Sequence, residues 1–448
     1  MIVFKRRLII WLIRAYIKKW GKVIVISFLA GLAIFFILFS TSSFLIKLIP
    51  IEKKSIIGVA GDYTVDQLPP FIVNKISVGL TTIDDKGHVK PGLAKSWDIT
   101  DKGHTYTFHL NKQITFSDGQ PLTSNDINYA FSDVKIDRPD PETIVYQLKE
   151  VYAPFLVTVS RPVLKNNFVG AGPYKLEDVE LNGTFLSTIT LISVKNKLFS
   201  QKYVFYANSD ILKIAFLLGE VTSAYSLTDT TYHHTNISNY PNVTLQKTTD
   251  YNQLVTLFMN TQDSELSDNQ IRSAIGYAMP NTFSEGERSY LPYPPQTWYF
   301  NSILPDKTQD FAHAKLLLEA DHAKVPTLTI QTLPKYEAVG EIIVKNLAQI
   351  GIKAKLVQVN TIPAKFQLYL GDFTLPQDPD QYALWHENEP NNITQLIDKR
   401  IDKFLEDGRQ TINEDDRKQI YDDFQKYLSD RAPAIFLYFP YVYTVSRK

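Results

Sequence analysis

Histidine and carboxylate side chains at close spacing are the first candidates for chemistry in this sequence. The pair His233-His234 and the string His386-Glu387-Asn388-Glu389 contain residue types that bind transition metals. Adjacent residues on a strand face opposite sides, and an isolated histidine is more commonly a surface or core residue than a ligand. We therefore predict no metal site and keep metal binding as a minor alternative.

Motifs of the common hydrolases and nucleotide-binding proteins are absent from the sequence. It has no G-x-S-x-G nucleophile motif, no H-E-x-x-H zinc motif and no cysteine. Gly87 to Gly92 has the glycine spacing of a phosphate-binding loop, but Leu93 stands where that loop needs a lysine. These observations predict a protein that is not an enzyme and needs no cofactor. Without cysteine, the chain has neither disulfides nor a lipid-attachment site.

Basic residues are concentrated at the N-terminus. The 448 residues include 47 Lys and Arg and 47 Asp and Glu. Eight of the basic residues and none of the acidic ones lie in the first fifty positions, which leaves 39 basic and 47 acidic side chains, a net charge of −8, for the rest. A negatively charged body argues against nucleic acid as a partner. Its length and 44% hydrophobic content allow two or more lobes.

The stretch from Val23 to Leu45 has the composition of a transmembrane helix. It is uncharged and long enough, at about 1.5 Å per residue, to cross a hydrocarbon core of about 30 Å. Because most early basic residues precede it, we predict a cytoplasmic basic segment (1–22), a single-pass anchor (23–47) in the cell membrane and an extracytoplasmic body. A cleaved signal peptide is the alternative, but no small-x-small site follows Phe44.

Beyond residue 50, strand and helix patterns alternate, which predicts an α/β body. Thr105 to Leu110 alternates polar and apolar residues as a half-buried strand does. Thr123 to Asp126 has capping-box spacing, which predicts a helix that continues through Phe131. Ser267 to Gln270 has the same spacing and predicts a second helix, ended by Pro280.

The C-terminal half contains a predicted strand–helix–strand unit. Leu328 to Gln331 predicts a strand, the periodic apolar residues that follow predict a helix ending at Gly351, and Lys353 to Val359 predicts another strand. Asn413 is a predicted cap for a later helix. Ala434 to Phe439 is a predicted apolar strand near the C-terminus.

A series of short blocks carries a resemblance to a known family. The blocks are Gly79 to Asp84, Val89 to Trp97, Tyr106 to Leu110, Thr115 to Thr123, Gly170 to Lys175, Phe258 to Thr261 and Ile271 to Met279. In this order they resemble the extracellular solute-binding proteins of family 5, the group that binds oligopeptides, dipeptides and nickel. Each block is weak by itself, and the ordered series is specific.

The resemblance implies a two-lobed periplasmic-binding-protein-like fold of type II, in the peptide-binding class with an extra subdomain, behind one N-terminal transmembrane helix. It places lobe I at 51–256 plus 434–448, with a shortened subdomain at about 86–168, and lobe II at 257–433. The strands that join the lobes are expected near Val255 to Asn260 and Ala434 to Phe439. Closure about these strands would enclose a ligand.

The resemblance also implies where ligand is bound. The stretches that face ligand in the family correspond to Ala60 to Asp66, Pro294 to Tyr299 and Leu370 to Asp380. The predicted ligand-binding residues are Tyr63, Thr64, Trp298, Asp372, Phe373, Asp378, Trp385 and Tyr438.

One residue departs from the family pattern. Peptide-binding members have an aspartate four residues before the proline that corresponds to Pro379, and its carboxylate pairs with the α-ammonium of the peptide. Here that position is Leu375, which cannot neutralise a desolvated ammonium. Either Asp372 or Asp378 substitutes for it, or the ligand has no free amine there.

The resemblance predicts an extracytoplasmic, monomeric substrate-binding component of an ABC transporter, which binds peptides or a similar small solute and delivers it to permease subunits. Its membrane partner would be reached through the N-terminal helix, and no nucleic acid is expected. Two alternatives stay open: a membrane-anchored ligand sensor without a transporter, and a receptor for nickel or a metal complex.

Overall fold

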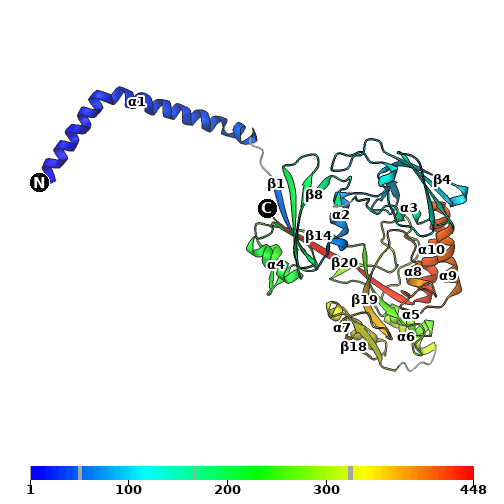
Figure 1. Cartoon of the computed structure of the whole chain (residues 1–448). Helices are drawn as coiled ribbons and strands as arrows, with labels where there is room; N and C mark the ends of the chain where they lie inside the picture. The colour runs from blue at the N-terminus through cyan, green and yellow to red at the C-terminus, as the bar shows by residue number, and fades with distance from the viewer. Residues whose placement is uncertain (1, 49–52, 166–167, 321–325) are drawn as a thin grey trace. The chain divides into compact units, whose positions relative to one another are not determined.

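The N-terminal region forms one long helix. The computed structural model describes residues 2–48, 53–165, 168–320 and 326–448 and divides into two units, Met1–Lys54 and Ser55–Lys448. In the first unit, α1 (Ile2–Leu48) is helical throughout (Figure 1). Its segment Leu8–Ile37 is long and apolar enough to cross a membrane, and its apolar side chains are not buried by protein. A signal sequence meets the same criteria, so the anchor stays a prediction.

Lobe I, within the second unit, is built around parallel strands. Its central strands and their crossover helix are β1 (Lys53–Ala60), β10 (Phe199–Tyr206), α4 (Ser209–Leu218) and β11 (Ser223–Leu227). β1 pairs in parallel with β11 and lies between β11 and β10 in the sheet. Asn208 caps α4 by accepting a hydrogen bond from the Ile211 amide at 3.0 Å, and Gly219 ends it in the left-handed region (φ +86°). Gly58 allows α4 to approach β1, because a Cβ there would lie 2.2 Å from Leu212 Cδ1.

Antiparallel strands and short elements complete lobe I. They are α2 (Pro70–Ile76), β8 (Tyr174–Asn182), β9 (Phe185–Ser193), β12 (Thr231–Tyr232) and β13 (Thr235–Asn236). β8 and β9 form the outer edge of the sheet next to β10. Apolar side chains pack on both of its faces, with α2 in one cluster and α4 in the other. Lobe I is therefore a layered α/β structure, as the sequence predicts.

The subdomain, which we define as β2 to β7 with α3, is an antiparallel sheet over an aromatic core. Its elements are β2 (Thr81–Ile83), β3 (Val89–Pro91), β4 (Ala94–Thr100), β5 (Thr105–Leu110), β6 (Val134–Asp140), β7 (Thr143–Leu148) and α3 (Phe155–Thr158). β4, β5, β7 and β6 are adjacent in that order, so the strand predicted at 105–110 is confirmed. Tyr106, Phe108, Tyr146 and Phe155 pack together beneath the sheet.

The helix predicted through Phe131 is wrong. The capping box at Thr123 and Asp126 forms, but only the three-residue 3-10 helix Ser124–Asp126 follows it. Ile127 and Tyr129 are buried, whereas the intervening Asn128 is exposed. This alternation has the two-residue period of an extended chain, and it places alternate side chains in the aromatic core.

Lobe II carries helices on both faces of its strands. Its elements are β15 (Gln253–Met259), α5 (Asn269–Tyr277), β16 (Gly286–Arg288), α6 (Phe311–Ala320), β17 (Leu328–Thr332), α7 (Glu337–Gln349), β18 (Ala354–Gln358), β19 (Leu368–Thr374), α8 (Tyr382–Trp385), α9 (Lys399–Gln410) and α10 (Glu414–Arg431). Along β15, Val255 and Leu257 pack with α5 and α7, whereas Leu254 and Phe258 pack with α9 and α10. The predicted strand–helix–strand unit is confirmed, because β17 and β18 pair in parallel on either side of α7. The Asn413 cap is also confirmed: its side chain accepts from the Asp416 amide at 3.0 Å.

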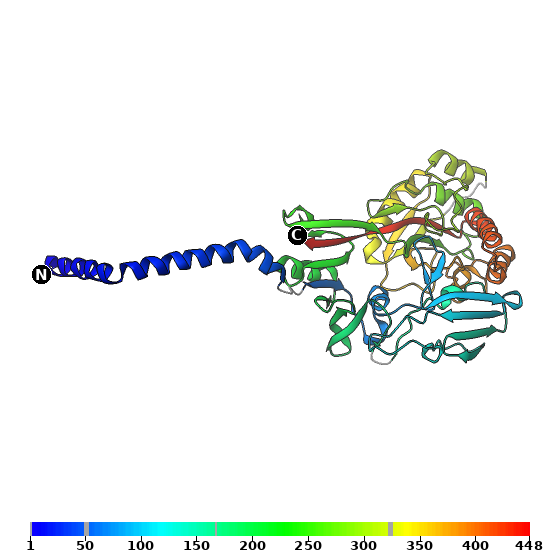
Figure 2. The ribbon, with the colours of Figure 1, turned by 90° about the horizontal axis from the view of Figure 1, so that it is seen from above.

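One strand, β20 (Ala434–Arg447), belongs to both lobes. Its first half pairs with β15 and β16, and its second half pairs with β11 and with β14 (Val243–Thr249). Figure 2 shows β14 and β20 running together to the C-terminus. The result is a 12-stranded sheet among the described strands, in which β20 passes from one lobe to the other. That the lobes are joined near Val255 to Asn260 and Ala434 to Phe439 stays a prediction. The residue boundaries of the lobes stay a prediction.

Candidate functional site

A cavity that we call the cleft pocket lies where the subdomain, lobe I and lobe II meet. It has a volume of about 490 Å³. Its lining residues are Ile83, Asp84, Asp85, Gly87, Thr249, Asp250, Tyr251, Asn252, Pro294, Gln296, Thr297, Tyr299, Leu375, Pro376 and Gln377. This volume is within the range of small-molecule sites.

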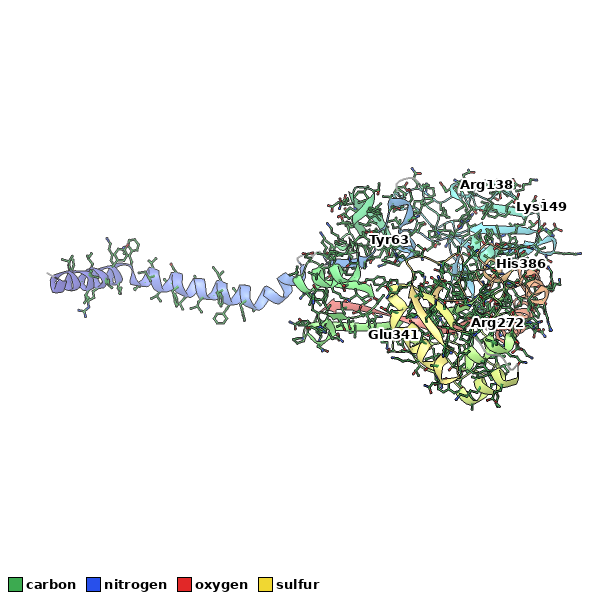
Figure 3. The ribbon with its side chains drawn as sticks, turned by 90° about the horizontal axis from the view of Figure 1, so that it is seen from below. Tyr63, Arg138, Lys149, Arg272, Glu341 and His386 are labelled. Carbon is green, nitrogen blue, oxygen red and sulfur yellow. The ribbon has the colours of Figure 1, made fainter. Side chains whose placement is uncertain are left out.

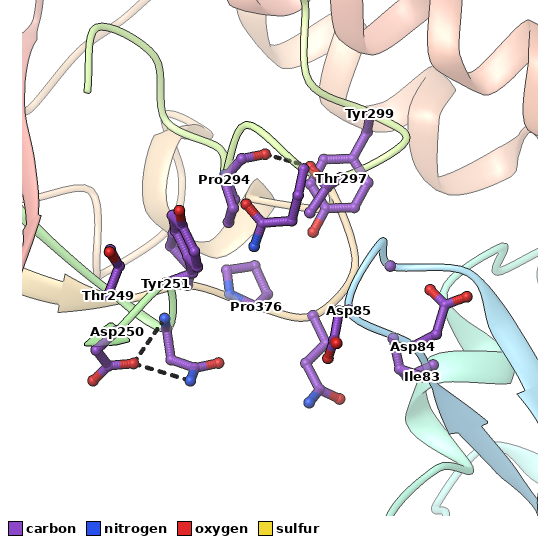
Figure 4. A pocket seen from close by; sticks show the side chains of 15 residues that line it. Ile83, Asp84, Asp85, Thr249, Asp250, Tyr251, Pro294, Thr297, Tyr299 and Pro376 are labelled. Atoms are coloured by element: carbon purple, nitrogen blue, oxygen red, sulfur yellow. Dashed lines mark hydrogen bonds between the residues drawn. The ribbon is translucent and has the colours of Figure 1, made fainter. Parts of the chain in front are cut away.

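Four chain segments supply the walls of the cleft pocket. The turn between β2 and β3 contributes the subdomain side, and the turn between β14 and β15 contributes the lobe I side. The other walls come from lobe II, from residues 294–299 and from the segment that follows β19. Figure 4 shows Asp250 on one side of the pocket and Asp84 and Asp85 on the other.

Contacts between the subdomain and lobe II close one end of this arrangement. The Trp298 amide donates to the Lys86 carbonyl at 2.9 Å, and the indole N–H donates to the Gly87 carbonyl at 3.0 Å. The Ala153 amide donates to the Arg409 carbonyl at 2.7 Å, which adds a second point of contact. Figure 1 shows α9 and α10 beside this part of the subdomain. These contacts fix the position of the β2–β3 turn opposite lobe II.

The turn between β14 and β15 is held by its own side chains. Asp250 Oδ1 accepts hydrogen bonds from the amide N–H and the side-chain Nδ2 of Asn252, both at 3.0 Å. Tyr251 donates to Glu287 Oε2 at 2.8 Å. Burial raises the pKa of Tyr251, and the hydrogen bond to Glu287 raises it further, so this phenol stays neutral. The turn therefore presents the Asp250 carboxylate from a fixed backbone.

The charges on the wall of the cleft pocket are all negative. Of the described residues that line it, Asp84, Asp85 and Asp250 are acidic and none is basic. Desolvation is the largest single influence on the pKa of Asp84 and raises it, but hydrogen bonds from the His88 and Lys86 amides and the Lys90 ammonium at 3.5 Å together lower this pKa overall. Within the described chain, Asp85 and Asp250 have no ion pair. The wall therefore favours a ligand with a cationic group.

A second cavity, which we call the aromatic pocket, contains three of the predicted site residues. It has a volume of about 170 Å³ and lies within lobe II. Asp372, Phe373 and Trp385 line it together with Phe258, Ile362, Tyr369, Leu384, Asn391, Ile393 and Thr394. Asp372 is neutralised by Lys335 at 2.9 Å. The Trp385 indole donates to Gln381 Oε1 at 2.7 Å, which fixes the ring at the wall.

The other five predicted site residues lie outside the aromatic pocket. Trp298 adjoins the cleft pocket through its neighbours Thr297 and Tyr299. Tyr63, labelled in Figure 3, and Thr64 lie in lobe I, where Tyr63 packs on Phe205 with ring centres 5.5 Å apart.

Asp378 and Tyr438 are both buried. Asp378 is only 6% exposed, accepts from both terminal guanidinium nitrogens of Arg417 and forms an ion pair with it. Tyr438 is 2% exposed and packs on Phe283. The structure thus does not gather the eight predicted residues in one cavity, and their ligand-binding role stays a prediction.

Two of the three stretches that the resemblance assigns to ligand contribute to the cleft pocket. They are Pro294 to Tyr299 and Leu370 to Asp380. Leu375, the residue that departs from the family pattern, is part of the pocket wall. Sequence reasoning missed Asp84, Asp85 and Asp250. The Asp-Tyr-Asn turn before an apolar strand was a usable signal for Asp250, because aspartate in such a turn caps its own backbone and leaves one oxygen outward.

The histidines considered as metal ligands lie in different parts of the fold. His386, labelled in Figure 3, is buried and stacks on Tyr382 with ring centres 4.1 Å apart. His233 and His234 form the turn between β12 and β13. Among the described residues there is no group of three or more His, Cys, Asp or Glu side chains that could hold a metal ion.

Comparison with known proteins places this geometry in a family. The model of the bacterial extracellular solute-binding proteins, family 5, matches residues 88–394. A probable D,D-dipeptide-binding periplasmic protein of Escherichia coli is 23% identical over 433 residues, which cover 80% of this chain and 81% of the relative.

Solved structures of similar fold include an ABC transporter substrate-binding protein of Listeria monocytogenes. It has a TM-score of 0.76 and 20% identity, and the match covers 89% of this chain and 94% of that one. A Campylobacter jejuni protein solved with Ni(L-His) has a TM-score of 0.71 and 21% identity over 89% of this chain and 94% of that one. With a family match over more than half of its length, this chain belongs to the bacterial extracellular solute-binding proteins of family 5.

Proposed function

We propose that this chain is the extracytoplasmic substrate-binding component of an ABC transporter. In this proposal it binds short peptides, or a similar small solute with a cationic group, in the cleft pocket and delivers them to permease subunits. It acts as a monomer held to the cell membrane by α1, with the N-terminus in the cytoplasm, and it catalyses no reaction. The observation that supports the ligand class is the cleft pocket itself, with three carboxylates and no cation among its described lining residues.

The partners of Asp372 and Asp378 support this choice of pocket. Both were candidates to replace the amine-pairing aspartate whose place Leu375 takes. Asp372 is paired with Lys335 and Asp378 with Arg417, so neither has an unbalanced charge for a ligand. Asp85 and Asp250 do, because no ion pair neutralises them within the described chain. A ligand ammonium near these carboxylates would gain attraction without the cost of a buried unpaired charge.

Native mass spectrometry of the full chain in mild detergent tests the proposal. We expect co-purified or added peptides to be retained, and peptides with an acetylated N-terminus to bind more weakly. The double variant D85N/D250N should weaken binding of free-amine peptides by about tenfold or more, because each lost charge pair contributes about 1 kcal/mol.

The matched control is D178N/D423N, which removes two exposed carboxylates that do not line the cleft pocket. It should leave the affinity unchanged. Equal weakening by both double variants would contradict the assignment of the pocket. Retention of nickel complexes with no peptide binding would favour a metal-complex receptor, and a chain that binds neither would favour a sensor for another ligand.

A further inference from the structure

One edge of lobe I lies at the end of the sheet opposite the cleft pocket. β1 and β11 are parallel, and α4 returns the chain from the end of β10 to the start of β11, so these strands begin at the same edge. The loop 194–199 leads into β10 at this edge. The last residues of β20 are there too, because Ser446 pairs with Ser223 at the start of β11.

The exposed side chains of this edge combine cations with apolar groups. We call the set Val194, Lys195, Lys197, Phe199, Leu218, Arg447 and Lys448 the basal patch. Leu218 is 71% exposed and Val194 is 44% exposed. The four basic side chains form no ion pair within the described chain, and the acidic Glu220 follows Leu218 by two residues. The patch is thus positively charged, although the chain beyond residue 50 carries a net charge of −8.

Backbone contacts hold the basal patch in place. Arg447 donates through its guanidinium to the carbonyls of Phe216 and Leu217, at the C-terminal end of α4. The Lys448 amide donates to the Asn242 carbonyl at 3.0 Å. These bonds fix the C-terminus beside Leu218, so the charges and the apolar side chains share one surface.

Few residues separate the end of α1 from the start of β1. Five peptide units separate Leu48 from Lys53, and a fully extended chain spans at most about 3.6 Å per residue, or about 18 Å in all. If the predicted segment 23–47 is the anchor of the proposed function, the start of β1 stays within this reach of the membrane. A partner of the basal patch would then lie at the membrane surface.

We propose that the basal patch docks on the surface of the anchoring membrane itself, through anionic lipid headgroups. Lysine and arginine near an anionic leaflet gain electrostatic attraction, and apolar or aromatic side chains between them enter the headgroup region. This docking rests on the anchor of the proposed function and adds an orientation to it. β14 runs from the basal patch to Asp250 over seven residues, about 23 Å, so docking holds the cleft pocket away from the lipid.

Site-specific fluorescence on the full chain tests this docking, and the absence of cysteine makes the label unique. A fluorophore on N242C, at the basal patch, is compared with one on Q147C in the subdomain, and quenching by nitroxide-labelled lipid is measured in vesicles. We expect quenching of the Asn242 label in phosphatidylcholine vesicles that contain phosphatidylglycerol and much less in phosphatidylcholine alone. The Gln147 label should be quenched in neither.

Charge reversal distinguishes docking through the basal patch from a general electrostatic attraction between the protein and the vesicle. Each basic residue near an anionic surface contributes about fivefold to the docked-to-free ratio, so K195E/K197E/K448E should lower that ratio by about 100-fold or more. The control K95E/K135E/K149E makes the same charge change on exposed lysines of the subdomain and should leave quenching intact.

Three results would overturn the docking. Equal quenching in both vesicle types, or full quenching of the basal triple variant, would exclude an electrostatic lipid contact. Quenching that needs added permease subunits would assign the basal patch to protein instead of lipid. A chain that does not float with the vesicles would overturn the anchor, and with it the docking, whereas a chain that floats without quenching overturns the docking alone.

Discussion

The cleft pocket and the neighbouring cluster of Asp378, Asp380, Arg409 and Arg417 both contain carboxylates. Those of the cluster form ion pairs, whereas two of those in the pocket form none within the described chain. Gln377 lines the pocket, and its neighbour Asp378 is buried in an ion pair with Arg417. Burial opposes the charge of Arg417, but the Asp378 carboxylate raises the pKa of Arg417 overall, so this guanidinium stays charged. Asp85 and Asp250 have no such partner in the described chain. The charge of Asp378 is therefore balanced inside the described part of the protein, whereas the charges of Asp85 and Asp250 are not.

The largest expected effect comes from breaking the buried pair. D378N leaves the Arg417 guanidinium buried without a counter-charge, which should destabilise the chain by about 3–5 kcal/mol. Denaturant unfolding of the full chain in detergent measures this. The double variant D378N/R417M removes both charges and should recover most of the loss. If the free energy of unfolding of D378N lies within about 1 kcal/mol of that of the parent, the Asp378–Arg417 pair does not stabilise the fold as expected.

A smaller effect is expected from adding a carboxylate to the pocket. L375D places an acidic group at the wall where the family pattern has one, and should tighten binding of free-amine peptides by about tenfold, or about 1.4 kcal/mol. Isothermal titration calorimetry with free and N-acetylated peptides measures the difference. L375N has nearly the same shape without the charge and should give no gain. Equal gains for both peptides would mean that the amine does not lie near residue 375.

The smallest effect is a difference in pH dependence between the two regions. Hydrogen bonds to Asp84 lower its pKa below the ordinary 3.8, so its contribution to stability is present above 3.8 and is lost as the pH falls through its folded value. Burial raises the pKa of Asp380 above 3.8, with Arg409 opposing, so its contribution is present below 3.8 and is lost as the pH rises through its folded value.

Unfolding midpoints from below pH 3.8 to neutrality measure these opposite signs. Relative to the parent, D84N should become less stable as the pH rises, and D380N should become more stable. Parallel midpoint curves for the parent and both variants would show that the environments of the two carboxylates are equivalent.

Local patterns predicted much of the fold. The parallel unit around α7 and the Asn413 cap follow from periodicity and capping rules, since both depend on residues close in sequence. The helix predicted after Asp126 failed because the alternate residues Ile127 and Tyr129 enter the aromatic core, and burial outweighs a capping signal.

The site was less predictable because its walls come from four distant segments. The resemblance led to Leu375 and to the stretch that includes Trp298. It could not show that Asp378 is neutralised, since Arg417 lies 39 positions further along the chain. The spacing of Asp85 and Asp250 in the sequence could not show that both line one pocket. Their approach depends on how the subdomain packs against lobe II.

The position of β1 within the sheet has a mechanical consequence. β1 lies between β11 and β10, so its hydrogen bonds to both neighbours run across the strand axis. A pull that arrives from residues before β1 and is directed along the strand loads these bonds in shear, all at once, and does not peel them one after another. A force that reached lobe I through the residues before β1 would thus be resisted by the hydrogen bonds of β1 to both of its neighbours together.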